Sequence, residues 1–313
     1  MKSLITKVAI TPDVFEPLCY ETTGEHTAAN DKIFDGLEAT GLVANLAAGK
    51  WKSHLTSSLI KLSPIALKLI KFLIERDRLV EHPTLSKKPI INDSDWFTEA
   101  MLLVEHKDID GVITTQAESA SNKTHPLKLG GIDFSYDWWK KPLELQTSVD
   151  RNIEEYISIL KPLLLHSNKI TFYDKILNPS KPSYRNFGKI LTICKDNKRK
   201  PIIELHRTIP RPNANDKEFF FKEEEWRNQF SPISKVAALY GLNIYVNIWN
   251  GRSLSLGTHP RFIITKLGSF SFEQGFDEGK GRNRITFMNR EESDLWQGNF
   301  RSTTNKPVFS FKL

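Results

Sequence analysis

The C-terminal half of the chain alternates short apolar runs with helical patterns. Runs rich in β-branched and aromatic residues predict three strands, at residues 169–174, 201–206 and 243–249. Between them, apolar residues recur at spacings of three and four, which predicts helices at about 183–195 and 224–240. Strands that alternate with helices indicate right-handed crossovers and a parallel sheet.

Two more elements frame this region. Ser148-Val149-Asp150 is expected to cap a helix that continues to about Leu165. Phe262-Ile263-Ile264-Thr265 predicts a fourth strand, followed by a turn at Leu267-Gly268-Ser269. This strand follows residue 249 too closely for a helical crossover, so we expect it to run antiparallel to its neighbour.

The N-terminal half carries weaker patterns. It predicts strands at 5–15 and 111–115, and helices at about 26–54, at 64–76 and from Asp95.

The composition between residues 117 and 147 shifts toward Ser, Asn, Lys, Gly and Pro, as in a linker or docking segment. We therefore expect an N-terminal domain over 1–116 and a C-terminal domain over 148–313. The expected class is α/β, with a mixed C-terminal sheet flanked by helices. The smaller N-terminal domain is expected to be α/β or mostly helical.

The charge balance adds a hint about partners. A net charge of +7 and a pI near 9.2 favour an acidic partner such as nucleic acid or an anionic membrane surface. Lys68 and Lys71 make the predicted helix at 64–76 basic and amphipathic. A packed surface helix is the favoured interpretation, and peripheral membrane contact is the alternative.

Cysteine use and the first residues favour a cytoplasmic location. Cys19 and Cys194 lie in different halves without a CxxC pair, so we expect neither a disulfide framework nor a cysteine zinc site. The first residues are more polar than a signal peptide. P-loop, zincin and nucleophile-elbow motifs do not occur, and no cofactor is expected.

Several candidate functional residues are expected at one edge of the C-terminal sheet. Ligands of open α/β sheets bind outside the carboxyl ends of the parallel strands, where Asp174 and His206 are expected. An antiparallel strand would begin at the same edge, with His259 and Arg261 on one face. Histidine serves as nucleophile or acid–base group, and arginine offers a planar fork for phosphate.

These residues resemble the phospholipase D-like superfamily. The chain reads H-x-R-F-I-I-T-x-x-G from His259 and G-F-D at 275–277, and the resemblance covers about residues 148 to 290. It is most similar to a single-motif branch that includes domains appended to membrane-trafficking proteins and bacterial proteins found among anti-phage defence genes. His259 matches the nucleophile, Arg261 replaces the phosphate-binding lysine, and Lys266 occupies the position of the motif aspartate.

The resemblance implies two classes of function. In the first, the protein is a metal-independent phosphodiesterase, a nuclease acting as a homodimer, with His259, Arg261 and His206 as catalytic residues. In the second, it is an inactive sensor or scaffold that binds nucleic acid, anionic lipid or a partner protein, alone or in a larger defence complex. Lys266 favours the second, since a lysine beside the histidine promotes anion binding over turnover. The phosphate-binding candidates are Lys266, Ser269, Arg282, Arg284, Asp174 and Asp277.

Overall fold

The chain folds into two compact units. The N-terminal unit is Ile5–Glu144, and the C-terminal unit is Leu145–Leu313 with Met1–Leu4. The computed structural model describes residues 4–15, 36–37, 41–57, 62, 64–115, 126–128, 146–209, 217–250, 261–301 and 306–313. Most of the expected linker at 117–147 lies outside the described residues. Among the described residues, no helix combines the length and apolar character needed to cross a membrane.

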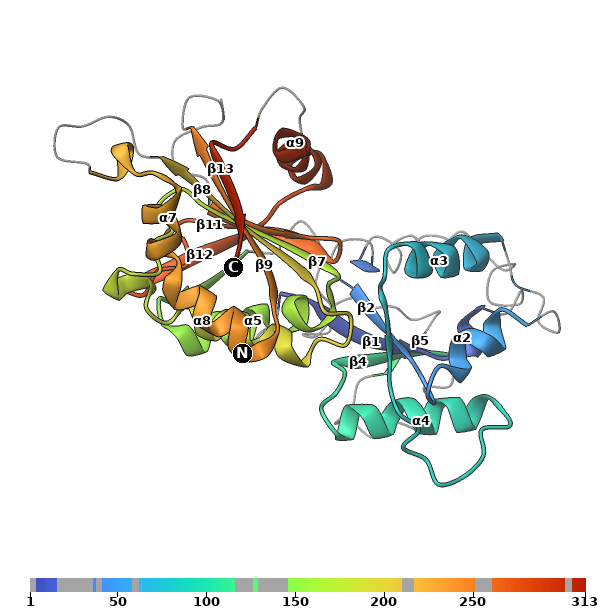
Figure 1. Ribbon diagram of the computed structural model, residues 1–313. Helices are drawn as coiled ribbons and strands as arrows, with labels where there is room; N and C mark the ends of the chain where they lie inside the picture. Colours follow the sequence, from blue (N-terminus) through green and yellow to red (C-terminus); the bar gives the residue numbers. More distant parts are fainter. Residues whose placement is uncertain are drawn as a thin grey trace. The chain divides into compact units, whose positions relative to one another are not determined.

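A parallel sheet of five strands, in the order β3-β2-β1-β4-β5, forms the centre of the N-terminal unit (Figure 1). Its strands are β1 (Thr6–Ile10), β2 (Gly41–Asn45), β3 (Leu79–Glu81), β4 (Gly111–Thr114) and β5 (Pro126–Lys128). Its described helices are η1 (Pro12–Phe15), α2 (Lys50–Leu55), α3 (Pro64–Glu75) and α4 (Asp93–Glu105).

The helical pattern predicted at 26–54 is wrong in part. Gly41–Asn45 forms β2, which pairs with strands on both sides, and the helix begins only at Lys50. The first four residues of β2 are buried, so this strand is a continuous apolar run rather than an alternation of apolar and polar residues. A short run of this kind is not distinguished from a buried helix by periodicity.

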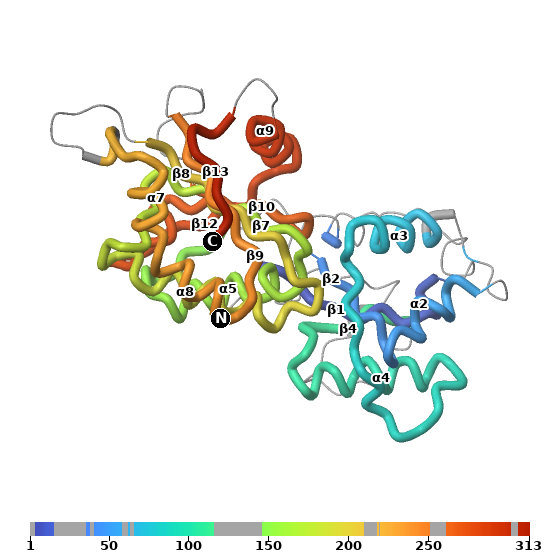
Figure 2. Tube along the Cα trace, in the orientation of Figure 1, coloured from blue at the N-terminus to red at the C-terminus, as the bar shows by residue number. Residues whose placement is uncertain are grey.

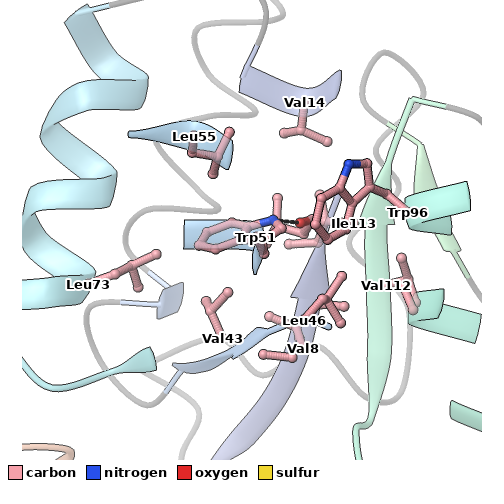
Figure 3. Packing of buried hydrophobic residues seen from close by; sticks show 14 of the residues in the cluster. Val8, Val14, Val43, Leu46, Trp51, Leu55, Leu73, Trp96, Val112 and Ile113 are labelled. Carbon is pink, nitrogen blue, oxygen red and sulfur yellow. Dashed lines mark hydrogen bonds between the residues drawn. The ribbon is translucent and has the colours of Figure 1, made fainter. Parts of the chain in front are cut away.

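Aliphatic side chains make up most of the described core of the N-terminal unit, and Phe15, Trp51 and Trp96 are its buried aromatic residues. Trp51 is fully buried and packs edge-on against Phe15, with ring centroids 5.8 Å apart. Its indole Nε1 donates to the carbonyl oxygen of Ile10 at 2.5 Å, which ties α2 to the end of β1. Figure 3 shows Trp51 surrounded by apolar residues from several elements, among them Val43 and Leu46.

The C-terminal unit is built on a mixed sheet of eight strands, in the order β13-β9-β8-β7-β10-β11-β12-β6. The strands are β6 (Gln146–Asp150), β7 (Lys169–Asp174), β8 (Ile202–Ile209), β9 (Asn243–Asn250), β10 (Arg261–Thr265), β11 (Gly268–Phe272), β12 (Arg282–Phe287) and β13 (Phe309–Lys312). Strands β7, β8 and β9 are parallel, and every other pair is antiparallel. The Cα trace shows the C-terminal strand β13 beside β9 (Figure 2).

Helices lie on both faces of this sheet. They are α5 (Ile153–His166), η5 (Pro182–Tyr184), α6 (Phe187–Thr192), η6 (Ile193–Asp196), η7 (Lys217–Phe220), α7 (Glu223–Gln229), α8 (Ser231–Tyr240) and α9 (Arg290–Arg301). Phe172 of β7 contacts Phe187 of α6 on one face, with ring centroids 5.4 Å apart. On the other face Trp296 of α9 packs on Phe262, at 4.4 Å. The α/β class predicted from the sequence is confirmed.

Two details of the predicted elements change. Ser148–Asp150 ends strand β6 rather than capping a helix, and the side chain of Asn152 caps α5 by accepting from the Glu155 amide at 2.9 Å. The strand at 261–265 is antiparallel to its neighbour, as predicted, but that neighbour is β7. The first residue of β10 therefore lies opposite the last residue of β7.

Candidate functional site

Asp174 and Arg261 meet at the carboxyl end of β7. They are register partners between β7 and β10, and the Arg261 Nε lies 3.5 Å from the Asp174 Oδ1. The carboxylate is fully buried, whereas the arginine side chain keeps 14% of its surface exposed. Arg261 also donates from Nη1 to the Glu273 carbonyl oxygen at 2.9 Å. One hydrogen bond, to Glu273, and one ion pair, with Asp174, therefore hold this guanidinium.

The buried carboxylate of Asp174 has donors of its own. The Tyr184 hydroxyl donates to Oδ2 at 2.8 Å, the Ile176 amide to Oδ1 at 3.0 Å, and the Phe276 amide to Oδ2 at 3.4 Å. Burial raises the pKa of Asp174, and these hydrogen bonds and the charge of Arg261 only partly oppose it. Burial, reinforced by the adjacent carboxylate, also raises the pKa of Tyr184.

Gly275 allows the loop between β11 and β12 to close over this pair. Its φ is +86°, which disfavours any side chain. A Cβ there would lie 2.6 Å from the Arg261 Cδ and 2.7 Å from the Asp174 Oδ2. The side chain of Asn283 holds the loop by donating to the Gly275 carbonyl oxygen at 2.7 Å. Only glycine fits this close approach.

Arg207 extends the charged row onto β8. Tyr173 pairs with His206 between β7 and β8, so Asp174 and Arg207, one residue further on, share the opposite face. Arg207 is buried, donates to Glu218 and Gln229, and lies 4.8 Å from the ring of Trp226. Burial lowers its pKa despite the Glu218 charge.

Asp277 lies beside the same loop. Its carboxylate pairs with Arg151, with 2.7 Å between Oδ2 and Nη2, and its carbonyl oxygen accepts from the Tyr156 hydroxyl at 3.2 Å. Its charge contributes to raising the pKa of Tyr184, which links the Asp277 pair to Asp174. Of the predicted site residues, the structure thus brings together Asp174, Arg261 and Asp277.

His206 does not belong to this group. It lies on the sheet face that α9 covers, where its ring sits 4.1 Å from the ring of Phe300. The Trp249 indole donates to Nδ1 at 3.0 Å, and Nε2 lies 3.5 Å from the Glu204 Oε2. Side chains alternate between faces, so His206 points away from Asp174 and Arg261. The structure therefore does not bring His206 together with Asp174 and Arg261.

Protonation of His206 should destabilise the fold. Burial lowers the pKa of His206 below its ordinary value, outweighing the Glu204 charge. As the pH falls below about 6.5, the unfolded chain binds the proton first, so the free energy of unfolding should drop by up to about 1.4 kcal/mol per pH unit. Urea unfolding at about pH 7 and pH 5.5 checks this. His206→Gln should lose this dependence of the free energy of unfolding on pH. The control His106→Gln, at the exposed end of α4, should keep it. An unchanged pH dependence in His206→Gln would contradict its attribution to His206.

Lys266 and Ser269 lie at the far end of β10. Lys266 follows the last residue of β10, five residues from Arg261, and an extended strand covers about 16 Å over that separation. Ser269 is buried, and its hydroxyl lies 2.8 Å from the Ser293 hydroxyl of α9. Position 266 is thus remote from the Arg261 end of the strand, and neither residue joins the Asp174 group.

Arg282 and Arg284 lie on the outer strand β12. Both are exposed, and Arg282 reaches Asp150 of β6 at 4.0 Å. Asn283 between them points into the core toward Tyr156, so the two arginines project from the opposite face. They are separate from the buried group at the end of β7.

His259, the predicted nucleophile, lies outside the described residues. Sequence reasoning missed Tyr184, Arg207 and the backbone amide of Phe276. The signal for Arg207 was available, since it follows His206 and must face the other way on a strand. Tyr184 reaches Asp174 from the short helix η5, and Phe276 reaches it from the loop between β11 and β12; neither contact has a signal in the local pattern.

The described residues contain no group of three or more His, Cys, Asp or Glu side chains arranged to hold a metal ion. The arrangement at the end of β7 is instead a set of arginine–carboxylate pairs, in which Arg261, Glu218 and the Arg151–Asp277 pair each keep a small part of their side-chain surface exposed. Comparison with known proteins adds no family assignment: no protein-family model matches the chain, and no curated protein matches it significantly.

Proposed function

We propose that the C-terminal unit is a phospholipase D-like domain that binds phosphodiesters, with nucleic acid as the ligand, in a bacterial anti-phage defence setting. The motif from His259 to Asp277 supports the family and the setting, and the basic chain supports the ligand. The observation that carries the binding proposal is Arg261, a partly exposed guanidinium held at the carboxyl end of a parallel strand.

The contacts of Arg261 suit phosphate recognition. The Arg261 Nη1 donates to the Glu273 carbonyl oxygen, whereas the buried Nε faces the Asp174 carboxylate at 3.5 Å and has no hydrogen-bond partner among the described residues. An arginine whose orientation is already fixed loses less conformational freedom when it binds an anion. It offers directed N–H donors to phosphate oxygens, to which charged hydrogen bonds are short and strong.

Replacing Arg261 tests this function. Arg261→Ala should weaken binding of a labelled single-stranded DNA by about tenfold or more, since a hydrogen bond to a charged group contributes about 1.5–3 kcal/mol. Arg261→Lys should recover only part of the affinity, because an ammonium lacks the planar fork. Fluorescence anisotropy at several salt concentrations measures the effect. Arg301→Ala, which removes the same charge from the exposed end of α9, is the control.

Equal dissociation constants for wild type, Arg261→Ala and Arg301→Ala, with all three proteins folded, would refute phosphate binding at Arg261.

Cleavage of the bound phosphodiester is the second candidate, and the observation that favours it is the position of His259 two residues before Arg261. The second imidazole of such a mechanism would come from another copy of the chain, since His206 faces the other side of the sheet. His259→Ala should abolish hydrolysis of bis-p-nitrophenyl phosphate, DNA or RNA. Equal rates of hydrolysis for wild type and variant would refute cleavage by His259 and leave phosphodiester binding as the only proposed function.

A further inference from the structure

The charges around Arg261 balance. Three arginines and three carboxylates form three pairs at this end of the sheet, and their charges cancel when all three carboxylates are ionised. The pairs are Arg261–Asp174, Arg207–Glu218 and Arg151–Asp277. An anion that binds at Arg261 adds a negative charge to this balanced cluster. A partly buried cluster resolves such an excess most readily by taking up a proton.

The Arg261–Asp174 ion pair is the longest of the three pairs. The Arg261 Nε lies 3.5 Å from Asp174, whereas Arg151 and Asp277 are 2.7 Å apart and Arg207 and Glu218 are closer still. Asp174 also holds three donors besides Arg261, so it keeps its place when the arginine turns to another partner. The Asp174 carboxylate thus acts as a resident counter-ion for Arg261.

We propose that an anion binding at Arg261 displaces Asp174 as the counter-ion and that Asp174 takes up one proton as it does so. This inference rests on the proposed phosphate-binding function and adds its regulation. In the empty site the Asp174 carboxylate competes with anions for Arg261, and protonation of Asp174 in mild acid removes this competition. The proton comes from the buffered solvent and bonds to the Asp174 Oδ2. The Tyr184 hydroxyl, which donates to Oδ2 in the empty site, can rotate and accept the new O–H, because a hydroxyl serves in both roles.

The groups that face Asp174 fit this exchange. They are Arg261 on β10, Arg207 on β8, Tyr184 on η5, and the loop between β11 and β12 that carries Asp277. Burial already raises the pKa of Asp174, and Arg261 is among the groups that oppose this rise. Directing the arginine to an anion removes that opposition, so the pKa of Asp174 rises further when the site is filled.

The experiment measures anion affinity against pH at constant ionic strength. The probe is a short labelled oligothymidine, whose phosphodiesters and bases keep their charge between about pH 5 and pH 8. Wild type should bind more tightly as the pH falls, by up to about tenfold per pH unit for one coupled proton. Asp174→Asn should bind tightly throughout with a flatter pH dependence. Asp294→Asn is the matched control, since it removes one charge from an exposed Arg–Asp pair that is also 3.5 Å long.

Calorimetry in two buffers of different ionisation enthalpy gives a second readout on the unmodified protein. It should show an uptake close to one proton per site on binding, and no uptake would overturn the inference even if Asp174→Asn fails to fold. A pH slope in Asp174→Asn equal to that of wild type, or weaker binding at every pH, would also overturn it. An Arg261→Ala variant that binds DNA as tightly as wild type would instead refute the proposed function, so the two failures are distinguishable.

Discussion

Asp174→Ala should lower the free energy of unfolding of the C-terminal unit by about 3–5 kcal/mol, because it removes one partner of a buried ion pair. The carboxylate is fully buried, and its loss leaves Arg261 without a counter-ion. It also leaves the Tyr184 hydroxyl and the Ile176 and Phe276 amides without their acceptor. Each unsatisfied buried donor adds its own desolvation cost. Urea unfolding followed by circular dichroism measures the change.

Asp294→Ala is the control for this prediction. Asp294 pairs with Arg290 at the same 3.5 Å, but both side chains are mostly exposed. Its loss should therefore cost no more than about 1 kcal/mol. Similar losses for the two variants would show that Asp174 does not act as a buried counter-ion.

Gly275→Ala should be the second most damaging change. An alanine at φ +86° costs roughly 1–2 kcal/mol in backbone strain. The added Cβ would also overlap the Arg261 Cδ at 2.6 Å and the Asp174 Oδ2 at 2.7 Å, and overpacking of this kind costs about 1–3 kcal/mol. Because the arginine or the loop must move, DNA affinity should fall together with stability.

Gly281→Ala is the control that separates backbone strain from steric overlap of the added Cβ. Gly281 has almost the same φ, +85°, but a Cβ there meets no atom within 4 Å. This variant should show only the strain of about 1–2 kcal/mol and should bind DNA like wild type. Equal losses of stability and affinity in the two glycine variants would mean that the contact with Arg261 and Asp174 has no role.

Local pattern predicted much of the C-terminal sheet. The apolar runs at 169–174 and 243–249 are strands, and the helical spacing between them yields crossovers that make these strands parallel. The short connection before residue 261 excluded a crossover, and β10 is indeed antiparallel. These inferences succeed because side-chain periodicity and connection length are local properties of the chain.

Strand pairing was beyond the same reasoning. The pattern at 41–45 predicts part of a helix, because burial on both faces erases the alternation that marks a strand. The neighbour of β10 proved to be β7, not β9, and the sequence contains no local record of this choice. Hydrogen bonding between segments far apart in the chain decided it.

The amino-acid sequence by itself determined the α/β class and placed Arg261 at the start of a strand, near the end of the strand that finishes at Asp174. Only the tertiary structure decided that these two residues pair while His206 turns to the opposite face and packs against α9. The physical reason is register: side chains alternate along a strand, so a shift of one residue exchanges the faces. That register is set by the packing of the whole sheet, through contacts such as those of Tyr184 and Gly275 that no local pattern encodes.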